Sequence, residues 1–229
     1  MNDMVRYELR ESVATISMDD GKVNALSSSM LASLAEAFDR AEADGAVVVL
    51  TGRPGIFSAG FDLQTLRAGG TDAVQMLKAG FELSERMLSF PTPVVVACPG
   101  HAIAMGSFLV LSADYRIGVS GDFRVTANEV AIGLTMPRAA IEICRQRLAP
   151  AQFNRAVMLA EVFSTDEAIA AGFLDKVVDA AELSQVSADA AQRLAALDLQ
   201  AHFSTKLRVR SNLLRDLRVA IEQDNADLE

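Results

Sequence analysis

Residues 99–114 read Pro-Gly-His-Ala-Ile-Ala-Met-Gly-Ser-Phe-Leu-Val-Leu-Ser-Ala-Asp, and the interpretation of the chain starts from them. The apolar run 94–98 before them predicts a strand, and the Pro-Gly pair predicts a turn. Small residues then stand where a helix is expected to begin. The first amides of a helix lack intrahelical partners and carry partial positive charge, and small residues let a ligand approach them. This stretch therefore predicts a binding site for a permanent or transient anion.

Composition and charge exclude several classes of protein. The chain has 229 residues, of which 51% are hydrophobic and 22% charged, as in a folded globular protein. Its net charge of -9 argues against nucleic-acid binding, which depends on Lys and Arg. Cys98 and Cys144 belong to no CxxC or Cys/His cluster, so neither a metal site nor a disulfide framework is expected.

Targeting signals are also not expected from the sequence. The N-terminal residues contain no apolar segment typical of a signal peptide. The long uncharged run 91–113 is interrupted by Pro and Gly, so it predicts a buried strand, a turn and a helix rather than a membrane span. We therefore expect a cytoplasmic protein with no membrane partner.

The hydrophobic pattern predicts one α/β core followed by helices. Residues 5–9 and 13–18 are typical of a hairpin. A helix is expected from Ser27, and the Val/Leu runs 46–50 and 94–98 predict buried parallel strands. Further predictions are a helix broken at 69–70, strands at 114–119, 123–125 and 173–178, helices beginning at Pro137 and Ser164, and helices covering 180–197 and 201–223.

Two strand-turn-helix units, 46–62 and 94–106, carry small residues at their turns. Neither unit contains GxGxxG or a P-loop, so dinucleotide and nucleoside triphosphate binding have little support. Taken alone, a Gly-containing turn of this kind is more often a structural feature than a functional one. Both turns together, with Glu129 following, favour a functional interpretation.

A family resemblance rests on Asn24-Ala-Leu26, Phe57-Ser-Ala-Gly-Phe-Asp-Leu63, Gly100-His-Ala-Ile-Ala-Met-Gly106, Asp114-Tyr-Arg-Ile117, Glu129, Gly133 and residues 168–178. With these motifs in order, roughly residues 5–180 resemble the crotonase superfamily, the enoyl-CoA hydratase/isomerase family. The resemblance implies a spiral of ββα units, an acyl-CoA thioester as substrate, and a homotrimer or a dimer of trimers. It implies a crotonase core at 1–180 and a helical C-terminal segment at 181–229 that mediates trimerisation.

The same resemblance implies roles for individual residues. The backbone amides of Phe61 and Met105 would form an oxyanion hole for an enolate, with Gly60 and Gly106 letting the backbone bend. Coenzyme A would enter as part of the substrate, with no tightly bound cofactor and no metal. Its expected contacts are Lys22, Val23, Ala25, Ala59, Asp62 and Leu63. For Lys22, a phosphate contact and a solvated turn position remain equally open.

The sequence departs from the hydratases of this family at one position. Hydratases carry two glutamates that face the acyl chain, and by register these fall on Phe108 and Glu129. Adding water needs two carboxylates, whereas moving a double bond needs one base. The chain therefore resembles the single-glutamate Δ3,Δ2-enoyl-CoA isomerases. The apolar neighbours Val125, Val130 and Ile132 are expected to raise the pKa of Glu129 and make it a better base.

Several alternatives stay open at this point. A 2-enoyl-CoA hydratase would need another carboxylate, such as Asp62, in place of Phe108. A non-catalytic acyl-CoA binder would need neither. Phe61 and Phe108 belong either to the core or to the acyl pocket, and His101 is either structural or a pocket residue. The basic run from Lys206 to Arg218 is either a solvated helix face, an interface or a coenzyme A contact across subunits.

Overall fold

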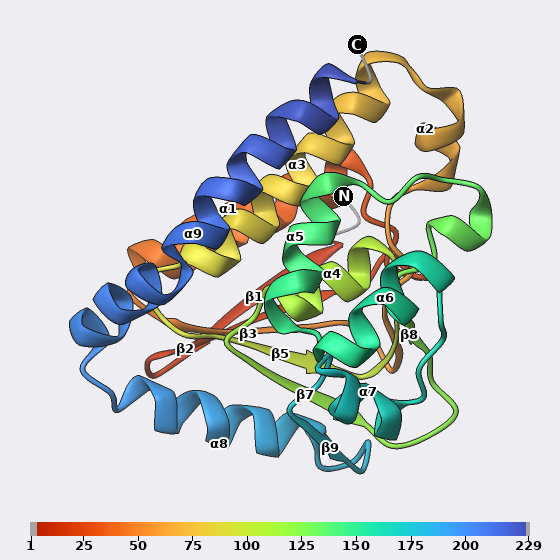
Figure 1. Ribbon diagram of the computed structural model, residues 1–229. Coiled ribbons are helices and arrows are strands. Elements are labelled where there is room, and N and C mark those ends of the chain that lie inside the picture. Colours follow the sequence, from red (N-terminus) through yellow and green to blue (C-terminus); the bar gives the residue numbers. More distant parts are fainter. Residues whose placement is uncertain (1–3, 228–229) are drawn as a thin grey trace.

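Two β-sheets organise residues 4–227, the part of the chain that the computed structural model describes (Figure 1). The larger sheet has the strand order β1-β2-β3-β5-β7-β9; β1 is antiparallel to β2 and the other pairs are parallel. The smaller sheet has the order β4-β6-β8 and is parallel. The strands are β1 Val5–Arg10, β2 Val13–Met18, β3 Val47–Thr51, β4 Gly55–Ser58, β5 Val94–Cys98, β6 Gly100–Ile103, β7 Tyr115–Val119, β8 Val125–Thr126 and β9 Lys176–Val178.

Helices cover both faces of the larger sheet. They are α1 Ser28–Ala43, α2 Leu63–Ala68, α3 Gly70–Ser89, α4 Met105–Leu111, α5 Arg138–Arg147, α6 Pro150–Leu159, α7 Thr165–Ala171, α8 Leu183–Ala195 and α9 Leu199–Ala226, with a short 3₁₀ helix, η1, at Val130–Ile132. Between residues 4 and 227, no helix combines the length and apolarity that crossing a bilayer requires.

The strands repeat one pattern along the chain. In each of the pairs β3–β4, β5–β6 and β7–β8, the first strand joins the larger sheet and the second joins the smaller one. A helical segment follows each pair before the chain enters the next strand of the larger sheet (Figure 1). The predicted spiral of ββα units is thereby confirmed.

Alternation along the strands assigns each side chain to one of two apolar layers. Val48, Leu50 and Val96 point to the main core, which α1, α3, α4, α5 and α9 cover. Val49 and Val95, at intervening positions, join a second cluster that is covered by α8. Figure 1 shows α8 on the opposite side of the larger sheet from α1, α3 and α9.

Most predicted elements are confirmed, and their end signals act as expected. The side chain of Ser27 accepts a hydrogen bond from the Met30 amide at the start of α1. Ser164 and Glu167 form a complete capping box at the start of α7. The helix expected up to residue 90 is broken at residues 69–70, between α2 and α3.

The prediction of a turn at residues 99–100 leading directly into a helix is wrong. Residues 100–103 form β6, and α4 begins only at Met105. β6 is four residues long and contains Gly and His, so its sequence carries no alternation. It is a strand because it lies between β4 and β8, and this pairing depends on segments far away in the sequence.

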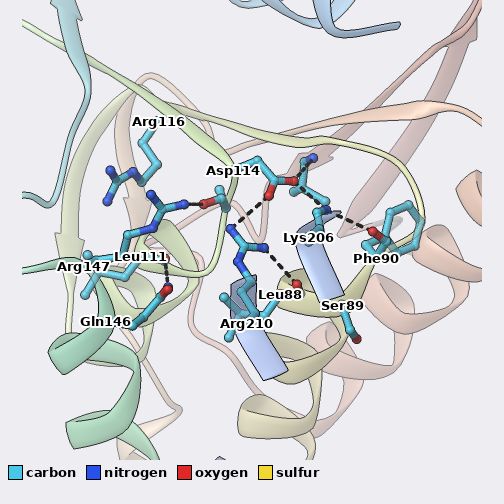
Figure 2. A network of polar contacts seen from close by, with 12 residues as sticks. Leu88, Ser89, Phe90, Leu111, Asp114, Arg116, Gln146, Arg147, Lys206 and Arg210 are labelled. Carbon is cyan, nitrogen blue, oxygen red and sulfur yellow. Dashed lines mark hydrogen bonds and ion pairs between the residues drawn. The ribbon is translucent and has the colours of Figure 1, made fainter. Parts of the chain in front are cut away.

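A buried ionic cluster fastens the C-terminal helix to the core (Figure 2). Asp114 accepts from the Lys206 ammonium at 2.7 Å and pairs with the Arg210 guanidinium at 2.9 Å. Lys206 also donates to the carbonyls of Phe90 and Thr92, and Arg210 donates to the carbonyl of Leu88. A solvated helix face was one of the alternatives for the basic run. This alternative is wrong for Lys206 and Arg210, because both side chains face inward from α9.

Candidate active site

Two neighbouring loops bring the amides of Phe61 and Met105 together. β4 and β6 are paired in parallel, so both loops leave the smaller sheet at the same edge. A Cβ atom added to Gly60 would lie 3.3 Å from the Met105 amide nitrogen. Met105 begins α4, where an amide has no intrahelical acceptor. Within residues 4–227, neither amide donates a hydrogen bond to another group, so the protein itself leaves both donors unused.

Of the two expected backbone bends, the one at Gly60 is found and the other lies at a different residue. Gly60 has φ +89°, a conformation that favours glycine. At the second loop the bend lies at Ala104, with φ 51°, rather than at Gly106. Gly106 is required for another reason, since a Cβ there would lie 2.5 Å from the Ser58 carbonyl oxygen. The strained Ala104 conformation directs the following amide out of the helix start, and such strain is typical of functional sites.

Asn24 holds the first loop in place. Its buried side-chain amide donates to the carbonyls of Met18 and Phe57, each at 3.1 Å. Ser58 donates its hydroxyl to the Asn24 carbonyl at 2.7 Å and accepts from the Gly60 amide at 3.1 Å. Sequence reasoning missed Ser58. The only signal for it is its place inside the motif 57–63, because a lone Ser before a glycine turn reads as an ordinary loop residue.

Glu129 reaches the site through β8. Thr126 pairs with Ile103, and its carbonyl accepts from the Ala104 amide at 2.9 Å, so the chain passes beside the second loop just before Glu129. The Glu129 side chain is buried, and its Oε2 atom has no hydrogen-bond partner among the described residues. Burial raises the pKa of Glu129 from 4.5 to about 7.

The residues that bury Glu129 are only partly the expected ones. Val125 is buried, but Val130 and Ile132 are 44% and 49% exposed, so they do not enclose the carboxylate. Cys144 of α5 lies close to Glu129. Burial raises the pKa of the Cys144 thiol, and the negative charge of Glu129 raises it further. The raised pKa of Glu129 agrees with the expectation, while α5 supplies part of the surroundings that local sequence cannot show.

Phe108 is buried on α4, one turn after Met105. Its ring stacks on Phe81 with 6.4 Å between centroids, and Phe81 meets the Phe61 ring edge-on at 6.0 Å. Phe81 and Phe108 belong to the main core, and Phe61 packs against it. The position at which the resemblance predicts the first glutamate of hydratases is thus filled by an aromatic ring within the core.

Asp62 serves as the N-cap of α2. One of its oxygens accepts from the Thr65 amide at 2.7 Å and from the Thr65 hydroxyl at 2.8 Å. These bonds, the amide bond foremost, hold the pKa of Asp62 below its usual value. An ionised and hydrogen-bonded carboxylate is a weak base, so Asp62 is a poor substitute for a carboxylate at Phe108.

The residues expected to contact coenzyme A lie along the loops beside the two amides. Asp20 holds the loop 20–25 by accepting hydrogen bonds from the amides of Lys22, Asn24 and Ala25. Burial raises the pKa of Asp20, but these bonds outweigh burial and the pKa lies below its usual value. The Ala59 amide donates to the Val23 carbonyl at 3.0 Å, and this bond joins the loop 20–25 to the loop that carries Phe61. Lys22, Val23 and Leu63 are exposed, while Ala25, Ala59 and Asp62 are half-buried.

Arg53 and His101 complete the surroundings of the site. The Arg53 guanidinium donates to the Lys22 carbonyl at 3.2 Å, which places a second cation beside Lys22. Sequence reasoning missed Arg53, because an Arg within a Gly-Arg-Pro-Gly turn carries no functional signal. His101 accepts from the Arg124 amide at 3.0 Å through Nδ1 and packs edge-on against Phe123. These contacts give His101 a structural role in joining β6 to the loop before β8.

Comparisons with known proteins agree with this geometry. The sequence matches the family model described as enoyl-CoA hydratase/isomerase over residues 8–227. An enoyl-CoA hydratase/isomerase family protein from Pseudomonas syringae is 48% identical, with a TM-score of 0.97 over 99% of both chains. An enoyl-CoA isomerase from Mycobacterium tuberculosis is 44% identical, with a TM-score of 0.95 over 99% of both chains. These matches confirm the predicted family and fold.

The curated relatives carry names of enoyl-CoA hydratases and of carnitinyl-CoA dehydratases. A probable enoyl-CoA hydratase from Rhodobacter capsulatus is 36% identical over 115 residues, which are 49% of this chain and 45% of the relative. The chain thus spans about half the length of the first curated relatives it matches. The similar proteins therefore agree on the family and differ on the reaction.

Proposed function

Because the chain belongs to the enoyl-CoA hydratase/isomerase family, we propose that it is an enoyl-CoA isomerase that moves a double bond from C3 to C2 of an acyl-CoA thioester. The observation that carries the proposal is the buried carboxylate of Glu129, with an oxygen that has no hydrogen-bond partner among the described residues and a pKa near 7. A general base works best when its pKa lies near the operating pH.

The reaction needs only one base. Ionised Glu129 takes a proton from C2, and the electron pair of that C–H bond spreads onto the thioester oxygen as a dienolate. The amides of Phe61 and Met105 donate to this oxygen and stabilise the charge. Protonated Glu129 then returns the proton at C4, a double bond forms between C2 and C3, and the carbonyl is restored. Each oxyanion donor of this kind contributes roughly 3 to 4 kcal/mol in other enzymes.

Hydration is the enzymatic alternative, and the hydratase names of the curated relatives favour it. It requires one group to activate water and another to deliver a proton. Phe108 cannot ionise, and Asp62 is occupied by capping α2. We therefore place isomerisation first. A non-catalytic acyl-CoA binder is disfavoured because a raised pKa and an unpartnered carboxylate oxygen have no use in binding alone.

The coenzyme A part of the substrate is proposed to lie along the loops 20–25 and 59–63. Lys22 and Arg53 supply positive charge for its phosphates, and the exposed apolar side chains of Val23 and Leu63 face its uncharged parts. No tightly bound cofactor is needed for this chemistry, since the enolate is held by main-chain donors.

The test is the conversion of 3-hexenoyl-CoA to 2-hexenoyl-CoA by the wild type and by Glu129→Gln. Glutamine keeps the shape of the side chain but cannot accept the C2 proton. We expect the variant to be slower by about 10² to 10⁴, the usual contribution of a general base. Glu36→Gln, which changes an exposed carboxylate on α1, is the matched control and is expected to keep the wild-type rate.

Other outcomes would select the alternatives. Unchanged isomerisation in Glu129→Gln would reject the assignment of the base. Hydration of crotonyl-CoA that is faster than isomerisation would select the hydratase. Tight binding of acyl-CoA thioesters without turnover of either substrate would select the non-catalytic binder.

A further inference from the structure

Gly80 lies in the middle of α3, where glycine is unfavourable, so its presence there requires a reason. A Cβ atom added to Gly80 would lie 2.4 Å from Cε1 and 2.5 Å from Cζ of Phe61. It would also lie 3.5 Å from the terminal methyl carbon of Met105. One glycine therefore contacts the side chains of both residues whose amides are proposed to bind the enolate oxygen.

The Phe61 ring has little freedom to avoid such an added atom. The ring also meets Phe81 edge-on, and Phe81 in turn stacks on Phe108 of α4. An aromatic ring cannot bend, so the ring must rotate as a whole or the Phe61 backbone must shift. Met105, which is completely buried, cannot move outward to make room.

We propose that Gly80 is a positioning residue for the oxyanion hole. Its missing side chain leaves the space in which the Phe61 ring lies, and the ring holds the Phe61 amide beside the Met105 amide. This inference rests on the proposed function, because it concerns the amides that bind the enolate oxygen. Gly80 itself touches neither the substrate nor the reacting atoms.

The experiment is a double-mutant cycle between Gly80→Ala and Phe61→Leu. Leucine is shorter than phenylalanine, so it removes the ring atoms that the new methyl group would meet, while the main-chain donor remains. Two rates are measured for each variant: isomerisation of 3-hexenoyl-CoA, and exchange of the C2 protons of hexanoyl-CoA in D₂O. The exchange reports enolate formation directly and does not require a double bond in the substrate.

We expect Gly80→Ala to lower kcat by about tenfold or more, because small displacements of catalytic groups have large effects on rate. KM should change by less than about threefold, since the coenzyme A contacts lie elsewhere. In the Phe61→Leu background the same substitution should cost less than about threefold, because the overlap is gone. The melting temperature should change little, because the preference of a helix for alanine over glycine offsets part of the cost of displacing the Phe61 ring.

Ser84→Ala is the matched control, one turn further along α3. Ser84 is buried, and its hydroxyl has no hydrogen-bond partner among the described residues, so its loss should leave both rates unchanged. An equal loss of rate from Gly80→Ala in both Phe61 backgrounds would overturn the positioning role while leaving the proposed function intact. A wild type without isomerisation or exchange would overturn the proposed function, and this inference with it.

Discussion

At Glu129, catalysis and stability make opposite demands on one side chain. The base must be ionised to take a proton, but burial disfavours its charged form and raises its pKa to about 7. The value is a compromise that leaves an appreciable ionised fraction at neutral pH together with a conjugate acid able to return the proton. This balance is set by the enclosure of the side chain and not by its chemistry alone.

The pH dependence of the rate should follow this pKa. We expect kcat/KM for 3-hexenoyl-CoA to rise with pH, with an apparent pKa of about 7, and to reach a plateau above it. Below pH 6 the rate should fall about tenfold per pH unit, because only the ionised fraction reacts. The measurement is a pH–rate profile from pH 5 to 9. A profile already flat at pH 5 would mean that Glu129 is solvated or is not the base.

Unfolding at different pH values gives an independent check. The folded-state pKa lies above the ordinary value of 4.5, so the stability from this group is present below pH 4.5 and is lost as pH rises through about 7. Well above pH 7, this pKa shift lowers the free energy of unfolding by about 3 kcal/mol relative to its value below pH 4.5. Glu129→Gln should therefore be stabilised relative to the wild type more at pH 8 than at pH 4.5, as measured by urea unfolding.

At the scale of elements, one carboxylate connects α9 to the strand ends. Asp114 accepts from the Val94 amide at the start of β5 as well as from Lys206, and it pairs with Arg210 (Figure 2). Burial lowers the pKa of Lys206, and the Asp114 charge opposes this. Removing the anion would leave two buried cations facing each other, which is far more costly than losing an exposed ion pair.

Asp114→Asn should therefore destabilise the protein by about 3 to 5 kcal/mol, the usual cost of breaking a buried ion pair. Urea unfolding at pH 7 measures this, with an unchanged m-value showing that the folded state stays compact. Arg218→Ala is the control. It removes an exposed ion pair between α9 and Glu85 of α3, and it should change stability little. Equal effects of both substitutions would contradict the importance of burial.

The sequence predicts elements well where the signal is local. The sequence predicts the helix start at Ser27, the break at 69–70 and the Val-rich strands. Each of these features depends on neighbours in the chain. β6 was not, because four residues containing Gly and His become a strand only by lying between β4 and β8. The site shows the same difference between local and tertiary signals. The sequence predicts apolar surroundings for Glu129. The contribution of Cys144 and the capping role of Asp62 depend instead on tertiary packing and local geometry.

At the scale of the whole molecule, some large apolar side chains remain exposed. Leu159 at the end of α6 is 70% exposed, Val209 on α9 is 78% exposed, and Ile132 and Leu134 after Glu129 are about half exposed. Exposed apolar side chains mark contact sites in soluble proteins where they gather into one patch. Leu217 and Ile221, on another part of α9, are buried in the main core. α9 is thus able to contribute to the core and to an assembly at the same time.

The family resemblance implies a homotrimer or a dimer of trimers, and we expect this assembly, with the segment 181–229 contributing to the contact. Light scattering after size-exclusion chromatography should give three or six times the chain mass of 24.5 kDa. Val209 on α9 is 78% exposed, so Val209→Asp should shift the protein toward smaller species with little effect on the stability of the isolated chain. The exposed substitution Glu36→Gln on α1 should leave the mass unchanged. A wild type that is monomeric at the concentrations at which it is active would show that these apolar regions serve another purpose and that one chain is sufficient for the site.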